Sequence, residues 1–108
     1  MKKTLSYEGY HLTFEDDFDG PALDRTCWNV ELHPPGWVNE ELQEYVDNDE
    51  VISLKDGQLL LRAVERVDET GKVSYTSGRV STQWKRDFTY GIFEARLRLP
   101  KCKGFLPA

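Results

Sequence analysis

Residues 50–66, EVISLKDGQLLLRAVER, decide the fold class. Two apolar runs, 50–54 and 58–66, are separated by Lys55, Asp56 and Gly57. Asp-Gly between such runs is a strong hairpin signal, because glycine accepts a positive φ without steric cost. The sequence therefore predicts two antiparallel strands joined by a tight turn.

Segments on both sides of this hairpin show the alternation of half-buried strands. YHLTFEDDF (10–18) spaces its apolar residues evenly, and FEARLRL (93–99) sets four apolar residues on one face and charged residues on the other. YTSGRVSTQW (75–84) has β-branched and aromatic residues around Gly78, which predicts a bulge or a close approach of another group to the backbone. The pattern indicates an all-β protein, either a sandwich or a barrel.

Other segments are expected to lie outside these strands. HPPGW (33–37) and RVDETGKVS (66–74) have the composition of surface loops. In residues 38–46, by contrast, Val38, Leu42, Tyr45 and Val46 repeat at helical spacing. Periodicity alone predicts a short helix there.

The composition fits one small domain and argues against a nucleic-acid partner. Hydrophobic residues make up 39% of the 108 residues and charged residues 31%, which is ordinary for a globular chain. The formal charge is −5, from 14 basic and 19 acidic residues, and no basic stripe is present. The phosphate-neutralising charge that dominates nucleic-acid binding is therefore missing.

The sequence predicts neither a membrane partner nor a zinc site. No run approaches the ~18–20 apolar residues that cross a bilayer, and the start, MKKTLSYEGYHLTF, lacks the apolar centre of a signal peptide. The chain either stays in the cytoplasm or has lost a secretion signal. Cys27 and Cys102 have no C-x-x-C spacing and no neighbouring His, so we expect two free thiols. His11 and His33 stand alone and are expected to be surface or satisfied residues.

Five segments taken in order carry a resemblance to a known family. They are FEDDFDGPALDRTCWNVE, GWVNEELQEYV, DGQLLLRAVE, YTSGRVSTQWKRDFTYGIFEARLRLP and KGFLPA. Together they resemble glycoside hydrolase family 16, and within it the laminarinase-like endo-β-1,3-glucanases. The resemblance implies a β-jelly-roll sandwich with a sugar-binding cleft on its concave face, of which residues 1–108 form a single partial domain, the amino-terminal portion. It also implies an extended rather than helical conformation for residues 41–45.

The same resemblance implies that the catalytic acids lie beyond this chain. Family members carry them downstream in an E-x-D-x-x-E or E-x-D-x-E motif, and retaining hydrolysis needs two carboxyl groups ~5–5.5 Å apart. The nearest match here, residues 15–20 (EDDFDG), ends on glycine and falls in the first strand, so we reject it. We expect no catalytic residue in the chain, which alone should be inactive. Residues 105–108 are expected to open another buried segment.

Three residues are candidates for sugar contact by this resemblance. Asn39 would offer an amide that both donates and accepts hydrogen bonds, although an Asn in a turn often serves only the backbone. Arg79 would bracket sugar hydroxyls with its planar fork, although an ion pair at a sheet edge is its alternative role. Trp37 would stack on a pyranose ring or only pin its loop. The substrate would be a β-glucan, with β-1,3-glucan, mixed-linkage glucan and galactans all open and the NEELQ and YTSGR segments favouring laminarin.

The resemblance also implies a partial calcium site. Family members hold a structural ion with groups that correspond to Asp17 and Gly57 and with an Asp on a final strand. Because calcium prefers six to eight oxygen ligands, we expect little binding by these two positions and no required cofactor.

Two further interpretations stay open. A sandwich with unpaired edges and uncovered apolar faces tends to self-associate, so the chain could be a non-catalytic β-glucan-binding half-sandwich that pairs with another chain. It could also be a truncated product without a function of its own.

Overall fold

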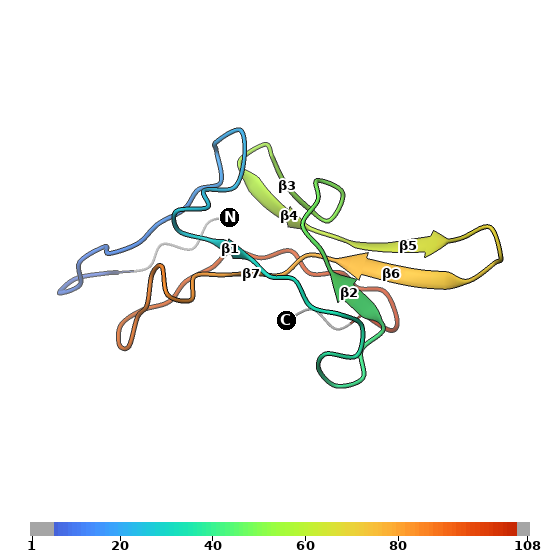
Figure 1. The fold of residues 1–108 in the computed structure, drawn as a ribbon. Helices are drawn as coiled ribbons and strands as arrows, with labels where there is room; N and C mark the ends of the chain where they lie inside the picture. The colour runs from blue at the N-terminus through green and yellow to red at the C-terminus, as the bar shows by residue number, and fades with distance from the viewer. Residues whose placement is uncertain (1–5, 106–108) are drawn as a thin grey trace.

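The computed structural model describes residues 6–105, and within that range the fold is all-β, with seven short strands in three sheets and no helix (Figure 1). The strands are β1 (Asn29–Val30), β2 (Gln43–Tyr45), β3 (Ile52–Lys55), β4 (Gln58–Leu61), β5 (Ala63–Val67), β6 (Val73–Ser77) and β7 (Val80–Ser81). The all-β prediction is confirmed.

The predicted hairpin is confirmed over Ile52–Leu61, whereas the second predicted strand is divided at Arg62 into β4 and β5, which lie in different sheets. Strands β3 and β4 pair antiparallel, and Lys55 lies opposite Gln58 at the turn. The two turn residues, Asp56 and Gly57, have φ values of 53° and 71°. Positive φ at both central positions is the geometry that a two-residue hairpin requires and that Asp-Gly provides.

The largest sheet has the order β2-β6-β5. Strands β5 and β6 form an antiparallel hairpin that projects from one end of the molecule (Figure 1). Its loop, residues 68–72, is ordered by the Asp68 carboxylate, which accepts backbone hydrogen bonds from Thr70 at 2.8 Å and Lys72 at 2.9 Å. Strand β2 runs parallel to β6 along its other edge.

The helix that periodicity alone predicts for residues 38–46 is wrong, whereas the extended conformation that the resemblance implies for residues 41–45 is confirmed at Gln43–Tyr45. Residues 38–41 form a turn, closed by a hydrogen bond from Glu41 N to Val38 O, and β2 follows as an extended strand. Long-range pairing explains the difference, because β2 satisfies its backbone groups against β6 and against residue His33. Such partners outweigh a local apolar period.

The strands predicted for residues 10–18 and 93–99 are also wrong, since neither segment has a strand partner among the described residues. Leu12 and Leu97 are 77% and 73% exposed. Phe14 instead packs against Trp28 and Phe88, with ring centroids 5.9 and 5.8 Å apart. The buried segment expected at 105–108 falls outside the described range except for Phe105, which is half-exposed.

The core lies where β3 meets the junction of β6 and β7. Val51 and Ile52 are the large side chains buried there. Gly78 sits between β6 and β7, and a Cβ at this position would lie 2.5 Å from Ile52 Cγ1 and 2.8 Å from the Val51 carbonyl oxygen. The close approach predicted at Gly78 is therefore confirmed.

The molecule exposes more surface than its mass requires. Its accessible area is 9620 Å², whereas a compact monomer of 12.5 kDa exposes about 6,200 Å². Its radius of gyration is 16.5 Å against about 13 Å for a compact domain of this length. The strands thus form an open layer rather than a closed sandwich.

Candidate functional site: a carboxylate, a guanidinium and three stacked rings

Pairing between distant segments builds the candidate site. Glu31 follows β1, and its backbone N–H donates to the Arg79 carbonyl oxygen at 2.9 Å, next to β7. Two residues further on, His33 and Tyr45 exchange backbone hydrogen bonds of 3.2 and 2.9 Å. Because side chains alternate along an extended chain, Glu31 and His33 lie on the same side.

Glu31 is the polar centre of the site. Its Oε1 accepts a hydrogen bond from His33 Nε2 at 2.9 Å and lies 3.3 Å from Arg79 Nε. The hydrogen bond from His33, with smaller contributions from Ser81 and from the charge on Arg79, holds the pKa of Glu31 below its usual range. Because its pKa is lowered, Glu31 is ionised at neutral pH, and its side chain, only 19% exposed, holds both neighbours in place.

The aromatic rings of His33, Trp37 and Tyr45 lie around the Glu31–Arg79 ion pair. The His33 imidazole stacks on the Trp37 indole, with centroids 3.5 Å apart and planes inclined by 9°. Tyr45 meets both rings edge-on, at 6.1 and 6.4 Å. The Arg79 guanidinium carbon lies 5.2 Å from the Trp37 centroid and 5.8 Å from that of Tyr45, which is cation–π distance.

A shallow, open depression of about 380 Å³ adjoins the cluster. It is lined by Asn29, Glu31, Leu32, His33, Ser81, Gln83, Trp84 and Lys85. Aromatic faces beside a fixed cation and a carboxylate can bind a neutral, hydroxyl-rich ligand, because the rings stack on C–H surfaces while the charged groups hydrogen-bond to hydroxyls.

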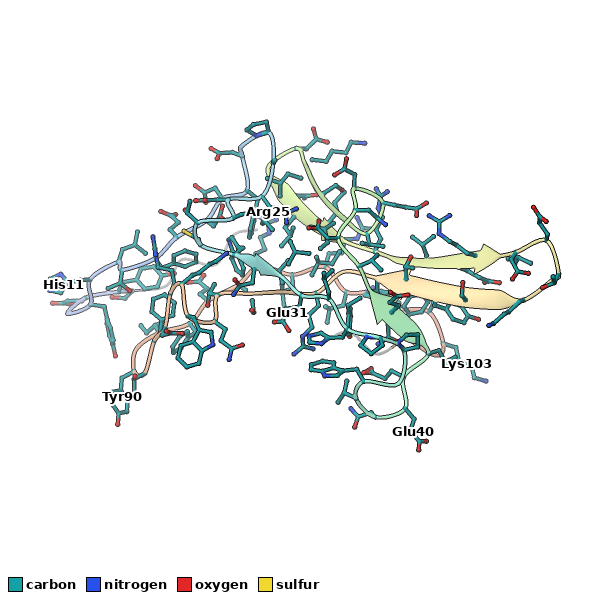
Figure 2. All side chains as sticks on the ribbon, in the orientation of Figure 1. His11, Arg25, Glu31, Glu40, Tyr90 and Lys103 are labelled. Atoms are coloured by element: carbon teal, nitrogen blue, oxygen red, sulfur yellow. The ribbon has the colours of Figure 1, made fainter. Side chains whose placement is uncertain are left out.

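The structure brings the side chains of Trp37 and Arg79 together, and it places Asn39 in the exposed turn that follows Trp37. Asn39 lies in the turn at 38–41, whose neighbour Glu40 marks the loop tip (Figure 2). Asn39 and Glu40 have φ values of 52° and 54°. Within residues 6–105 the Asn39 side chain makes no hydrogen bond, and its left-handed backbone accounts for an Asn at this position.

Sequence reasoning missed three members of the site, Glu31, His33 and Tyr45. The sequence predicts a surface or satisfied residue at His33. In the structure His33 is half-buried, hydrogen-bonded to Glu31 and stacked on Trp37. The sequence pattern that could have indicated these residues is Glu31-x-His33. In an extended segment this spacing puts an acid and a base on the same side of the chain. Their contact with Tyr45 depends on the pairing of β2 with distant segments, which no local pattern predicts.

The positions expected to contribute to calcium binding, Asp17 and Gly57, are neighbours. A Cβ on Gly57 would lie 3.9 Å from the Asp17 carbonyl oxygen. No group of three or more His, Cys, Asp or Glu side chains within residues 6–105 is arranged to hold a metal ion. These two positions therefore fit only part of the oxygen shell of a calcium ion.

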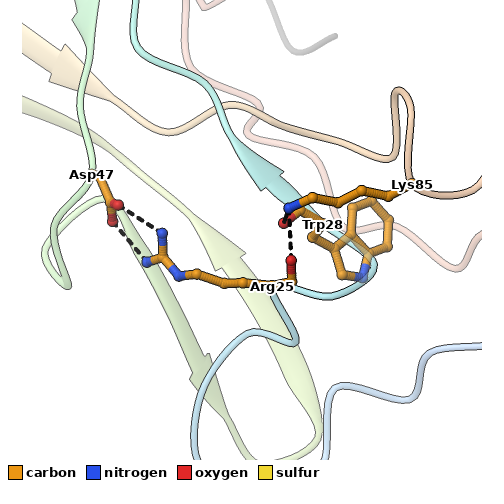
Figure 3. A network of polar contacts seen from close by, with 4 residues as sticks. All are labelled: Arg25, Trp28, Asp47 and Lys85. Carbon is orange, nitrogen blue, oxygen red and sulfur yellow. Dashed lines mark hydrogen bonds and ion pairs between the residues drawn. The ribbon is translucent and has the colours of Figure 1, made fainter.

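A polar network supports the site from the side of β1 (Figure 3). Arg25 donates two hydrogen bonds to the Asp47 carboxylate, at 2.7 and 2.9 Å. The Lys85 ammonium donates to the carbonyl oxygens of Arg25 and Trp28, at 2.6 and 3.1 Å. The network connects three segments: the one before β1, which contains Arg25 and Trp28, the one after β2, which contains Asp47, and the one after β7, which contains Lys85.

The acidic and thiol groups outside the site include Asp16, which hydrogen-bonds within the fold, and two cysteines that form no disulfide. Asp16, in the rejected match at 15–20, accepts hydrogen bonds from Trp28 Nε1 at 2.7 Å and from Phe18 N at 2.8 Å. Cys27 and Cys102 are both free, as predicted. Across residues 6–105 there is no helix with the length and apolar character that crossing a membrane requires.

Comparisons with known proteins agree on one relationship. The glucan endo-1,3-β-glucosidase of Cryptopygus antarcticus is 42% identical over 109 aligned positions, which cover 96% of this chain and 39% of that protein. The glucan endo-1,3-β-glucosidase A1 of Niallia circulans is 32% identical over 113 positions, 93% of this chain and 17% of that protein. No protein-family model matches the chain.

A solved structure gives the same result for the fold. The catalytic domain of an endo-1,3-β-glucanase (laminarinase) from Thermotoga petrophila superimposes with a TM-score of 0.60 and 34% identity, over 75% of this chain and 34% of that domain. The chain thus spans well under half the length of each of these relatives. By sequence and by fold, the chain is similar to part of the laminarinase catalytic domains, which is consistent with part of a glycoside hydrolase family 16 jelly-roll.

Proposed function

We propose that this chain supplies part of the sugar-binding surface of a glycosidase that hydrolyses internal β-1,3- or mixed β-1,3/1,4-glucan linkages. The observation that carries the proposal is the contact of Arg79 with Trp37 and Tyr45 beside the ionised Glu31. Relatives named for glucan endo-1,3-β-glucosidase activity support the choice of polysaccharide.

In this proposal Arg79 is the residue that recognises the sugar. Its Nε is engaged by Glu31, which fixes the plane of the guanidinium and leaves other N–H groups of the fork for sugar hydroxyls. Asn39 would add an amide contact from its exposed turn, and Trp37 an apolar surface for the C–H face of a pyranose. The formal charge of −5 favours a neutral polysaccharide over a polyanion.

The hydrolytic step needs groups that this chain does not supply. Retention requires one ionised carboxylate as nucleophile and one protonated carboxyl group as acid, ~5–5.5 Å apart. The only carboxylate within the site, Glu31, is engaged by His33 and Arg79 and is held ionised. We therefore expect the 108-residue chain to release no reducing ends from laminarin, with the reaction carried out by a longer polypeptide. Calcium is expected to contribute little at Asp17 and Gly57.

Binding of laminarin oligosaccharides to the chain tests this proposal. Titration calorimetry should detect binding in the wild type, and Arg79→Ala should weaken it about tenfold or more, because a charged hydrogen-bond donor contributes roughly 1.5–3 kcal/mol. Arg98→Ala is the matched control, since Arg98 is exposed and lies outside the site. Equal affinity of Arg79→Ala and the control would refute the assignment of Arg79.

A second candidate function is a non-catalytic glucan-binding half-sandwich that pairs with another chain. The observation that favours it is the exposed apolar surface, which includes Leu12, Trp84, Tyr90, Phe93 and Leu97. Such a pair would bind glucan without cleaving it. Absence of both binding and association would instead favour a product with no function of its own.

A further inference from the structure

His33 covers one face of the Trp37 indole, and we propose that it is a displaceable cover that a glucan ring must move aside in order to stack there. The inference rests on the proposed function. The two rings are nearly parallel, with centroids 3.5 Å apart. That separation is van der Waals contact and leaves no room for a sugar ring between them.

Two kinds of contact hold the cover in place. The His33 backbone is fixed by its hydrogen bonds with Tyr45, so rotation of the His33 side chain can uncover this face of the indole without any change in the backbone. The ring itself is held by the hydrogen bond from Nε2 to Glu31 at 2.9 Å. Rotation therefore breaks both the stack and this hydrogen bond, whereas the strand pairing that shapes the site stays intact.

The neighbouring groups show why His33, rather than another residue, controls access. Tyr45 is almost equally far from the two stacked rings, 6.1 Å from His33 and 6.4 Å from Trp37, so it lies beside the stack and not over the indole face. Arg79 stays anchored to Glu31 when His33 rotates, because its Nε lies 3.3 Å from the same carboxylate. A sugar that displaces His33 thus meets a stacking face and a fixed guanidinium together.

The cover makes sugar stacking weaker than it would be on a bare indole. Stacking of a pyranose on the face that His33 covers must displace the imidazole, and loss of one aromatic stack lowers affinity about three- to tenfold. His33 is accordingly a positioning residue that sets affinity and makes no contact of its own with the sugar.

Proton NMR tests the cover directly, because the chain contains only two histidines. His11 is exposed and lies far from Glu31 in the molecule, so it is an internal reference (Figure 2). The ring protons of His33 should be shifted upfield of those of His11 by the Trp37 ring current. Laminarin oligosaccharide should move the His33 signals downfield, toward those of His11, as the stack opens.

Calorimetry with three variants gives an independent readout. His33→Ala should bind laminarin oligosaccharide about three- to tenfold more tightly than wild type. His11→Ala, the matched control, should bind like wild type. His33→Phe keeps a flat ring on the indole but loses the hydrogen bond, and it should bind no more than slightly better than wild type.

The outcomes separate the cover from the proposed function. Wild-type binding with stationary His33 signals, or with no gain in His33→Ala, overturns the cover and leaves the proposed function standing. Absence of binding in both wild type and His33→Ala overturns both. If His33→Ala fails to fold, the wild-type NMR titration decides, because a free protein without upfield-shifted His33 signals contradicts the inference.

Discussion

At the scale of single residues, Gly78 is the position where the packing leaves least room. A Cβ there would meet both the Val51 carbonyl oxygen and the Ile52 side chain at less than 3 Å. We expect Gly78→Ala to lower the free energy of unfolding by about 1–3 kcal/mol, as overpacking does, measured by urea denaturation. Gly20→Ala is the control, because its Cβ would meet only ordinary contact at 3.6 Å. Equal effects of the two substitutions would contradict the packing described for Gly78.

Glu31 should make stability depend on pH. Its folded-state pKa is lowered, first by the His33 hydrogen bond, so its contribution is present above the unfolded pKa and is lost as pH falls through the folded value. Replacing it by Gln should cost about 1–2 kcal/mol at neutral pH. The difference in unfolding free energy between wild type and Glu31→Gln should then shrink below about pH 4.5. A difference that stays constant down to pH 3 would show that the Glu31 charge is not stabilising.

At the scale of elements, the turn at 38–41 stores strain that a substitution can relieve. Glu40 has a φ of 54°, a conformation that favours Gly or Asn over a residue with a long side chain. We expect Glu40→Gly to raise the free energy of unfolding by about 0.5–1 kcal/mol. Glu41→Gly, in the same loop, should not stabilise the protein, because the φ of Glu41 is not positive. Thermal unfolding of the two variants checks this prediction. A lower stability of Glu40→Gly than of wild type would contradict the strain assigned to Glu40.

Elements whose geometry is fixed locally could be predicted from the sequence, and elements that depend on distant partners could not. The hairpin at 50–66 followed from Asp-Gly alone, and the close approach at Gly78 from a glycine within a strand pattern. Residues 38–46 carry a helical period, yet β2 pairs with β6, a partner that no local pattern reveals. In the candidate site, Trp37 and Arg79 were proposed through the family resemblance, whereas the contact of the stacked His33 with Tyr45 depends on that same unpredicted pairing.

At the scale of the whole molecule, the exposed apolar surface predicts association. The area in excess of a compact monomer, about 3,400 Å² by the same scaling, lies in the range that large obligate interfaces bury. We expect light scattering to show a mass that rises with protein concentration. A monodisperse monomer across the micromolar range would contradict this, and it would show that the open layer is stable without a partner.

The pairing of β1 with β7 has a consequence for the order of folding. Asn29 and Ser81, which face each other across these strands, are 52 residues apart in the chain, whereas the β3–β4 turn spans two. Closing a long loop costs conformational entropy before any stabilising contact can form. Hairpins are therefore expected to form early, and pairs of strands that are distant in the sequence are expected to form late. The Glu31–Arg79 contact joins the same two distant segments. In refolding experiments, recovery of sugar binding should therefore lag behind recovery of β-sheet signal, and the site would report the last step of folding rather than the first.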